Sequence, residues 1–134
     1  GPRQDPSSAY SGVISIFNNR LRRGLPVTVF GDGMQTRDFV FVADVVRFLL
    51  AGMARAPEVA GQVFNICTGR TTTLMGLIDA LARQHGVQAV VHHAEPRVGD
   101  IRESLGDPAR ARGMLGVTAD VRLDDGLARL LRGA

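Results

Sequence analysis

The Gly-Asp-Gly turn at residues 31–33 restricts the fold more than any other feature, because it ends one apolar run and opens a polar stretch. Turns of this kind end strands, so residues 25–30 (LPVTVF) are predicted to form a short strand that stops at the turn. The next apolar run, residues 39–42 (FVFV), is long enough only for a buried turn of strand. Asp44 is predicted to cap or begin a helix over residues 45–55, whose apolar residues follow helical spacing.

The rest of the chain alternates between helical and strand-like patterns, which indicates an α/β fold with a small mixed sheet and flanking helices. The further predicted elements are a helix capped by Ser11 that extends through Leu21, a strand over 63–67, a helix between the N-cap Thr73 and the stop Gly86, a strand over 87–91, and helices over 107–115 and 123–131. No G-x-G-x-x-G turn follows an early strand, so a complete dinucleotide-binding (Rossmann) fold is not encoded here.

Composition indicates one globular domain over residues 1–134, since 45% of the residues are hydrophobic and 22% are charged. No apolar run reaches the roughly 18 residues of a membrane span and no signal peptide pattern opens the chain, so we expect a cytoplasmic protein with no membrane partner. The net charge of +3 comes from 16 basic residues, all of them arginines and mostly dispersed. Without a clustered basic patch or a reading motif, nucleic-acid binding is not expected.

Arg37 is the first candidate for a binding residue, because it follows the glycine turn and directly precedes an apolar run. The guanidinium group offers a fork of donors that matches two phosphate oxygens, which lysine cannot match geometrically. An ion pair with Asp38 or Asp44 is the alternative that the spacing leaves open.

A second candidate lies in a loop that contains glycine and proline, where Arg97 and Arg102 flank Asp100. An arginine there can neutralise a phosphate while the Asp100 carboxylate accepts hydrogen bonds from vicinal sugar hydroxyls, and such loops on a rigid scaffold are common binding devices. The residues alone equally allow a solvated salt bridge within the loop.

Other reactive residue types lack the surroundings that their chemistry needs. His92 and His93 are adjacent near a predicted strand end, so one is expected to face the interior and the other the solvent, and a metal site needs more ligands. Cys67 is interpreted as a small core residue and has no partner for a disulfide. No serine stands in a G-x-S-x-G setting, and we predict no catalytic residue in this chain.

Six stretches form an ordered set of motifs: residues 1–6 (GPRQDP), 10–17 (YSGVISIF), 30–45 (FGDGMQTRDFVFVADV), 64–69 (FNICTG), 97–104 (RVGDIRES) and 107–116 (DPARARGMLG). Together they resemble the C-terminal, substrate-binding part of the NAD-dependent epimerase/dehydratase family, the extended short-chain dehydrogenases that act on nucleotide sugars. Within that family the pattern is most similar to the UDP-glucose and UDP-N-acetylglucosamine 4-epimerases. The resemblance extends over essentially the whole chain.

The resemblance implies a site for a UDP-sugar. By motif, Arg37 and Arg97 would contact the substrate diphosphate, and Asp100 the ribose hydroxyls. The strand Thr28-Val29-Phe30 would pass along the uracil, with backbone hydrogen bonds and the Phe30 ring against the base.

A further contact is implied at the start of the first helix. Gly12 and Val13 would meet a phosphate there, where free backbone amides favour anions. Some members of the family place an asparagine near Val13, and this chain has none, so the contact would come from backbone amides.

The resemblance also implies a missing N-terminal region that holds NAD and carries a Tyr-x-x-x-Lys catalytic pair. Tyr10 is followed four positions later by Ile14 and not by lysine. NAD is therefore expected as the cofactor of a parent enzyme and not as a tight ligand of this chain, which we expect to be an inactive fragment. Strands and apolar faces that normally meet the missing region would be exposed, so the chain is expected to self-associate.

Two other functions remain open from the sequence. A dehydratase, decarboxylase or reductase of a nucleoside diphosphate sugar would have the same C-terminal half, because the residues that distinguish these reactions lie beside the missing catalytic pair. A stand-alone binding domain without enzymatic activity is the other alternative.

Overall fold

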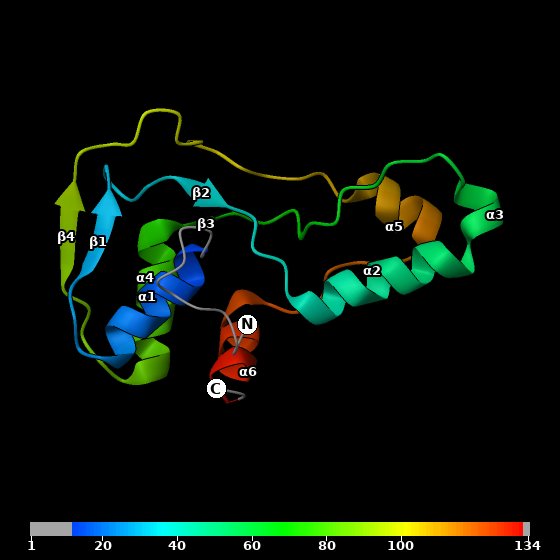
Figure 1. Ribbon diagram of the computed structural model, residues 1–134. Coiled ribbons are helices and arrows are strands. Elements are labelled where there is room, and N and C mark those ends of the chain that lie inside the picture. The colour runs from blue at the N-terminus through cyan, green and yellow to red at the C-terminus, as the bar shows by residue number, and fades with distance from the viewer. Residues whose placement is uncertain (1–11, 133–134) are drawn as a thin grey trace.

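A computed structural model describes residues 12–132, and its architecture is α/β (Figure 1). In chain order the elements are α1 (Val13–Arg22), β1 (Val27–Phe30), β2 (Thr36–Arg37), α2 (Val42–Ala54), α3 (Ala56–Val59), β3 (Thr72–Thr73), α4 (Leu74–His85), β4 (Val91–Ala94), α5 (Ala109–Leu115) and α6 (Leu123–Arg132). Among these described elements, no helix is long and apolar enough to cross a membrane.

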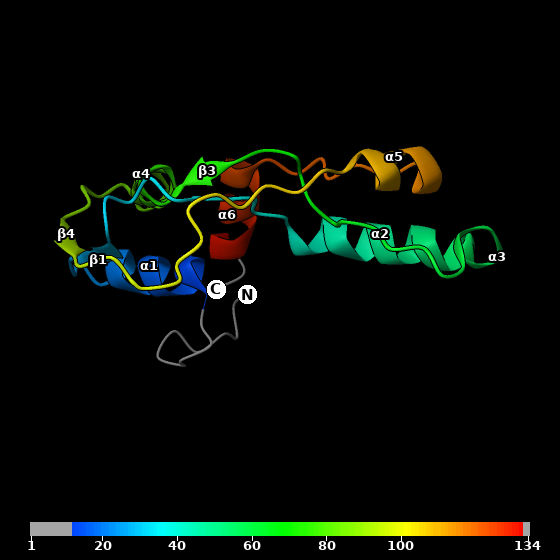
Figure 2. The ribbon, with the colours of Figure 1, turned by 90° about the horizontal axis from the view of Figure 1, so that it is seen from above.

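The strands form two small sheets and not the single mixed sheet that the sequence predicted. Strands β1 and β4 pair in parallel, with Val27 opposite Val91 and Phe30 opposite Ala94. Strands β2 and β3 pair antiparallel over two residues each. Figures 1 and 2 show β1, β4, α1 and α4 on one side of the molecule, α2, α3 and α5 extending to the other, and α6 between them.

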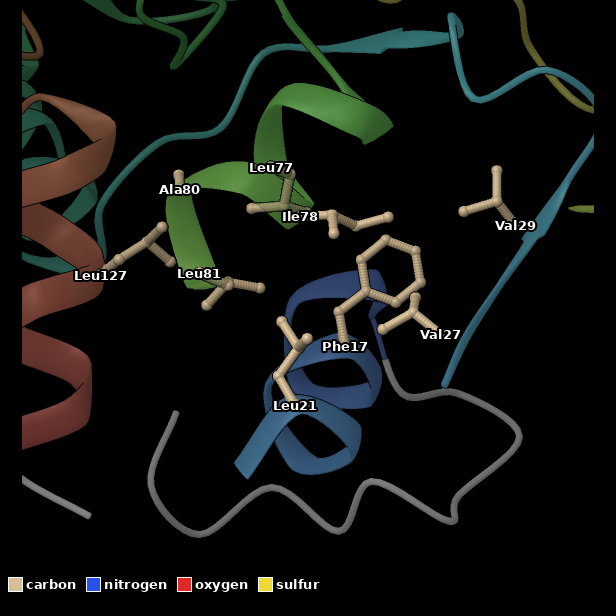
Figure 3. Close-up of a cluster of buried hydrophobic side chains, with 9 residues drawn as sticks. All are labelled: Phe17, Leu21, Val27, Val29, Leu77, Ile78, Ala80, Leu81 and Leu127. Carbon is tan, nitrogen blue, oxygen red and sulfur yellow. The ribbon is translucent and has the colours of Figure 1, made fainter. Parts of the chain in front are cut away.

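The main core fills the space between α1, β1, α4 and α6 (Figure 3). Its buried side chains are Phe17, Leu21, Val27, Val29, Leu77, Ile78, Ala80, Leu81 and Leu127. Val27 and Val29 are buried while Thr28 between them is exposed, as strand alternation requires. Each large apolar side chain buried here contributes roughly 1.5–3 kcal/mol, so this cluster fixes β1 against the helices.

Helix α4 begins and ends where its sequence predicted. The hydroxyl of Thr73 accepts a hydrogen bond from the Gly76 amide at 3.0 Å, which satisfies one of the free donors of the first turn. At the other end, Gly86 takes a left-handed conformation with φ of 64°, which residues with a side chain rarely adopt. The local capping residues therefore mark both ends of this helix.

Helix α2 begins earlier than predicted, at Val42 with Phe41 in the N-cap position, so residues 39–42 are not a turn of strand. Asp44 lies in the first turn, where the helix dipole favours a carboxylate, and does not cap the helix. It is buried, and it accepts hydrogen bonds from Arg47 at 2.9 Å and from the Val121 amide at 3.0 Å. This carboxylate fixes α2 to the segment before α6.

Other element boundaries also differ from the prediction. Residues 63–67 are not a strand, since no backbone partner pairs with them in the described part of the chain, and Val63 is 76% exposed. The fourth strand covers Val91–Ala94 instead of residues 87–91, because the register with β1 selects that segment. Helix α1 begins at Val13 with Gly12 in the N-cap position, whereas the predicted cap, Ser11, lies outside the described residues.

An apolar face remains exposed along α2. The side chains of Val42, Val46, Leu49, Leu50 and Met53 are between 47% and 73% exposed. They recur at helical spacing, so they form one continuous strip. Contiguous exposed apolar surface of this kind is typical of an interface.

We predict that this chain, produced alone, self-associates through the apolar face of α2. Replacing Leu49 and Met53 by glutamate should shift it towards the monomer in sedimentation velocity over a concentration series, because the charges interrupt the strip. Val98→Glu, at a fully exposed loop position, is the matched control and should leave the association state unchanged. A wild-type chain that stays monomeric at the highest concentration contradicts the prediction.

Candidate functional site

The candidate site lies where β1 and β4 end. Because the two strands run parallel, the loops that follow them leave the same edge of the pair, and the Gly31 amide donates to the Ala94 carbonyl at 2.8 Å. We call residues 30–37 the first loop and residues 97–104 the second loop. The first loop turns sharply at Gly33, whose φ is 74° and where a Cβ atom would lie 2.8 Å from Met75. Only glycine fits this turn.

The second loop runs beside β2 almost as an additional strand. The Thr36 amide donates to the Arg102 carbonyl at 2.9 Å, and the Ser104 amide donates to the Thr36 carbonyl at 3.2 Å. These backbone hydrogen bonds fix the register between the two loops. The side chains that follow are therefore held opposite one another.

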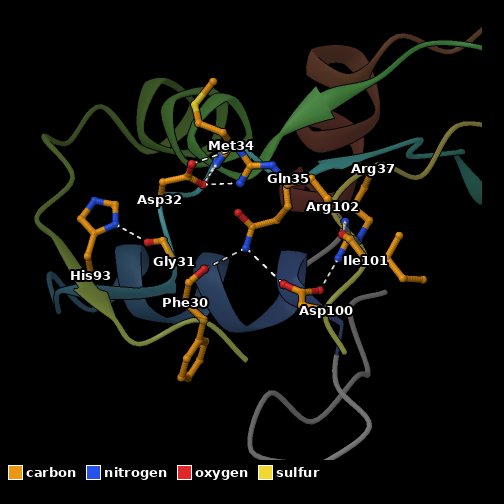
Figure 4. A network of polar contacts seen from close by, with 10 residues as sticks. All are labelled: Phe30, Gly31, Asp32, Met34, Gln35, Arg37, His93, Asp100, Ile101 and Arg102. Atoms are coloured by element: carbon orange, nitrogen blue, oxygen red, sulfur yellow. Dashed lines mark hydrogen bonds and ion pairs between the residues drawn. The ribbon is translucent and has the colours of Figure 1, made fainter. Parts of the chain in front are cut away.

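Arg37 and Asp100 form an ion pair at the centre of the two loops (Figure 4). The Nη2 atom of Arg37 lies 2.7 Å from Oδ1 of Asp100, and both side chains are about one-third exposed or less. Nη1 of Arg37 donates to the carbonyls of Thr36 at 2.8 Å and Ile101 at 2.6 Å. The sequence alternative of an ion pair with Asp38 or Asp44 is therefore wrong, because the partner is Asp100.

Gln35 lies behind this pair and was not singled out by its sequence position. Its side-chain amide donates to the Phe30 carbonyl at 2.9 Å and to Oδ2 of Asp100 at 3.2 Å (Figure 4). The residue is only 5% exposed. A glutamine next to a glycine turn gives no sequence signal for this role, since both partners are set by the fold.

A second ion pair joins the loops nearer the solvent. Both nitrogens of the Arg102 fork contact the Asp32 carboxylate, at 2.6 and 2.9 Å, and the Met34 amide donates to the same carboxylate at 2.9 Å. These contacts lower the pKa of Asp32 to about 2 and raise that of Arg102. Arg102 therefore contacts the first loop. The described ion pairs of Asp100 and Arg102 are made with the first loop, and not within the second loop as the salt-bridge alternative expected.

Arg97 stacks on an aromatic ring. Its guanidinium carbon lies 3.7 Å from the centroid of the Phe30 ring, a cation–π contact between the two loops. Arg97 thus covers one face of the Phe30 ring, the ring that was expected to lie against a base. Of the other residues in that strand, Thr28 is exposed, whereas Val29 is 1% exposed and packs in the core opposite His93, so Val29 has no surface open to a ligand.

Gly12 and Val13 lie at a different surface, a hollow of about 790 Å³. Residues from the N-terminus of α1, from segment 37–42 and from α6 line it. Arg37 also lines this hollow, whereas Arg97, Asp100 and Phe30 do not. The structure therefore divides the predicted site residues into two groups that share Arg37.

Asp38, which directly follows the first loop, connects that loop to the turn at residues 68–69, a role that its sequence position did not reveal. Its carboxylate accepts hydrogen bonds from the Thr68 amide at 3.0 Å, the Thr68 hydroxyl at 2.6 Å and the Gly69 amide at 2.9 Å. Three donors on one carboxylate hold the turn at residues 68–69 against the residue that follows Arg37.

The histidines and the cysteine take no part in the two loops' ionic contacts. His92 and His93 are both exposed in β4, so the expectation that one faces the interior is wrong. His93 Nδ1 contacts the Gly31 carbonyl at 2.7 Å and so supports the glycine turn. Cys67 is buried, as expected, and burial raises the pKa of its thiol.

The residues present do not fit NAD. A dinucleotide site of the Rossmann type needs a glycine-rich turn from a strand directly into a helix, whose N-terminus binds the pyrophosphate. Here the glycine turn after β1 leads into β2, and β4 leads into the second loop. Within residues 12–132, neither parallel strand is followed directly by a helix.

Comparisons with known proteins point to one family. The sequence matches the model of the NAD dependent epimerase/dehydratase family over residues 1–67. It is 43% identical over 130 residues to the UDP-glucose 4-epimerase of Mycolicibacterium smegmatis, an alignment that covers 96% of this chain and 40% of the relative.

Solved structures agree with the sequence comparison. The fold is similar to UDP-glucose 4-epimerase from Thermotoga maritima, solved with UDP-glucose, with a TM-score of 0.88 and 41% identity over 99% of this chain and 43% of that one. It is also similar to the Thermus thermophilus UDP-glucose 4-epimerase complex with NAD, with a TM-score of 0.82 and 33% identity over 100% of this chain and 44% of that one. The chain spans about two fifths of the length of these proteins.

The geometry of the Asp32–Arg102 pair predicts a pH dependence. Arg102→Ala should raise the pKa of Asp32 from about 2 towards its ordinary value of 3.8, as measured by NMR titration of the carboxyl carbon. Because the folded pKa is lowered, the pair stabilises the fold fully above the ordinary value and loses that contribution as pH falls through about 2. An Asp32 that titrates near 3.8 in the unsubstituted protein contradicts the assignment.

Proposed function

The chain belongs to the NAD-dependent epimerase/dehydratase family, and we propose that it binds the UDP part of a nucleotide sugar as the C-terminal, substrate-binding part of a UDP-hexose 4-epimerase. The observation that carries the proposal is the meeting of Arg37, Arg97 and Asp100 on two loops at one strand edge. Two cations suit a diphosphate, and a carboxylate between them suits ribose hydroxyls.

Arg37 retains donors for a phosphate although it contacts Asp100. Nη1 is used by two carbonyls and Nη2 by the carboxylate, whereas Nε–H and the second Nη2 hydrogen have no partner among the described residues. These two hydrogens are available for the oxygens of a phosphate. Arg37 also lines the hollow beside Gly12 and Val13, so it joins the two groups of site residues.

Arg97 supplies the second positive charge. Stacking on Phe30 holds the plane of its guanidinium group while its N–H edge remains directed outward from the ring. A diphosphate between Arg37 and Arg97 would be neutralised from both sides. In this arrangement the Phe30 ring supports Arg97 and meets the base at its free edge.

The open edge of β1 suits the uracil. The Val27 amide donates to the Val90 carbonyl just before β4, and the Gly31 amide donates to the Ala94 carbonyl, so the backbone groups of Thr28 and Phe30 point the other way. The Phe30 carbonyl is already bonded to Gln35. The amide and carbonyl of Thr28 are therefore the groups that we assign to the base, and Val29 contributes through the core behind them.

The hollow beside α1 suits the other end of the ligand. At about 790 Å³ it lies within the usual size range of small-molecule sites. Helix α1 has no acidic residue in its first turn, so the amides at Gly12 and Val13 are favourable for an anion. We assign the second phosphate and the sugar to this hollow.

NAD and the catalytic pair belong, in this proposal, to the remainder of a longer parent enzyme. The chain covers 43% of the Thermotoga maritima epimerase and does not itself fit NAD. Its contribution to the reaction is to hold the nucleotide so that the sugar stays in one orientation, which lowers the entropic barrier of the chemical step.

Arginine substitutions test the proposed site. Arg37→Ala and Arg97→Ala should each weaken UDP binding about tenfold to a hundredfold in isothermal titration, since each removes charge-assisted hydrogen bonds to the diphosphate. Arg112→Ala, an exposed arginine in α5, is the matched control and should leave the affinity unchanged. Unchanged affinity in both site variants would overturn the assignment.

The chain alone should have no turnover. Incubated with NAD and UDP-glucose, it should leave the sugar unchanged by proton NMR, because no catalytic Tyr-x-x-x-Lys pair is present in the sequence. The parent enzyme should form UDP-galactose under the same conditions. Epimerisation by the chain alone would contradict the proposal that the catalytic pair lies in the remainder of the parent enzyme. A dehydrated or reduced product from the parent enzyme would assign a different reaction to it.

A further inference from the structure

We infer that Gln35 is a positioning residue that fixes the Asp100 carboxylate for the ribose hydroxyls of the nucleotide, an inference that rests on the proposed function. The residue is 5% exposed and stands immediately before β2. Its backbone is also held, since the Leu74 amide donates to the Gln35 carbonyl at 3.1 Å. The backbone from which the Gln35 side chain extends is therefore fixed in position.

The side-chain amide of Gln35 has one orientation. Nε2 contacts Oδ2 of Asp100 and the carbonyl of Phe30, and both of these groups are acceptors. The nitrogen must therefore face them, and Oε1 faces the opposite way. Figure 4 shows the amide between the two acceptors, with its oxygen turned away from them.

Oε1 is buried and has no hydrogen-bond partner within the described part of the chain. Such an oxygen is unfavourable, and methionine would fill similar space without it. A contribution to packing therefore does not account for a glutamine at this position. The donor end, which contacts Asp100 and Phe30, does.

The contact with Gln35 matters most when a ligand binds. Before binding, the carboxylate of Asp100 is held on one side by Arg37 at 2.7 Å and on the other by Gln35 at 3.2 Å. A diphosphate at the free donors of Arg37 shares the guanidinium charge with the carboxylate, and so weakens the contact between Arg37 and Asp100. Gln35 is uncharged and buried, so its hydrogen bond to Asp100 persists when Arg37 also binds the phosphate.

The same amide sets the spacing between the ribose and the base. By occupying the Phe30 carbonyl, Gln35 removes it from the groups that a ligand can contact and leaves the backbone of Thr28 as the free edge. One side chain thus links the acceptor for the ribose to the strand that faces the base. The result is a preference for nucleotides with vicinal ribose hydroxyls.

The test compares two ligands on the full chain: UDP and 2′,3′-dideoxy-UDP, which lacks the vicinal hydroxyls. The unsubstituted protein should bind UDP about tenfold more tightly, since a carboxylate that accepts from hydroxyls discriminates by that order. Gln35→Met should reduce this preference to about twofold while binding of the dideoxy ligand changes little. Asp100→Asn should abolish the preference, and adding Gln35→Met to it should have no further effect on the preference.

Controls separate positioning from stability. Gln88→Met removes the same amide from an exposed glutamine, and it should leave both affinities unchanged. Gln35→Met should unfold at the same temperature as the unsubstituted protein or higher, because it removes the buried oxygen along with the donor.

Each contrary outcome has a distinct meaning. A Gln35→Met variant with the same ligand preference as the unsubstituted protein, or with equal losses for both ligands, overturns the positioning role and leaves the arginine assignment standing. An unsubstituted chain that binds both ligands equally overturns the role of Asp100 and this inference with it. An unsubstituted chain that binds neither ligand overturns the proposed function as well.

Discussion

The candidate site depends on the parallel pairing of β1 with β4. Val27 lies opposite Val91 and Phe30 lies opposite Ala94, so both strands end at the same edge and send their loops in the same direction. An antiparallel pair would send the two loops to opposite ends, and Arg37 could not meet Asp100. The carboxyl edge of parallel strands is the usual ligand position in α/β proteins. Here only two strands suffice to create such an edge, because helices α1 and α4 bury the side chains of β1.

Besides the hydrogen bond from Gln35 to Asp100, three arginine contacts then join the loops: Arg97 on Phe30, Arg37 on Asp100, and Arg102 on Asp32. Exposed ion pairs contribute little to stability individually, about 0–1 kcal/mol, so these contacts do not hold the loops together on their own. The backbone hydrogen bonds of Thr36 with the second loop carry that role. The ionic contacts instead determine the orientation of each guanidinium group, which is the property that a binding site needs.

The sequence predicted the parts of the structure that local interactions decide. Helix α4 follows from Thr73 and Gly86, and the turn that ends β1 follows from Gly31 and Gly33. It did not predict the partner of Arg37, because Asp100 is 63 residues away and the two meet only through strand pairing. The prediction of a strand over residues 63–67 was wrong for a related reason, since a strand requires a partner strand that composition does not reveal. Gln35 and Asp38 were missed as well, because their roles arise from neighbours that are distant in the sequence.

In the proposed site, Arg37 and Arg97 bind the diphosphate of UDP while Asp100 accepts hydrogen bonds from the ribose hydroxyls. A crystal structure of the chain soaked with UDP tests it most directly. We predict that the diphosphate contacts both guanidinium groups, that the ribose hydroxyls donate to the Asp100 carboxylate, and that Nε2 of Gln35 remains on that carboxylate. A nucleotide bound elsewhere, or a diphosphate that touches neither arginine, would contradict this assignment of the site.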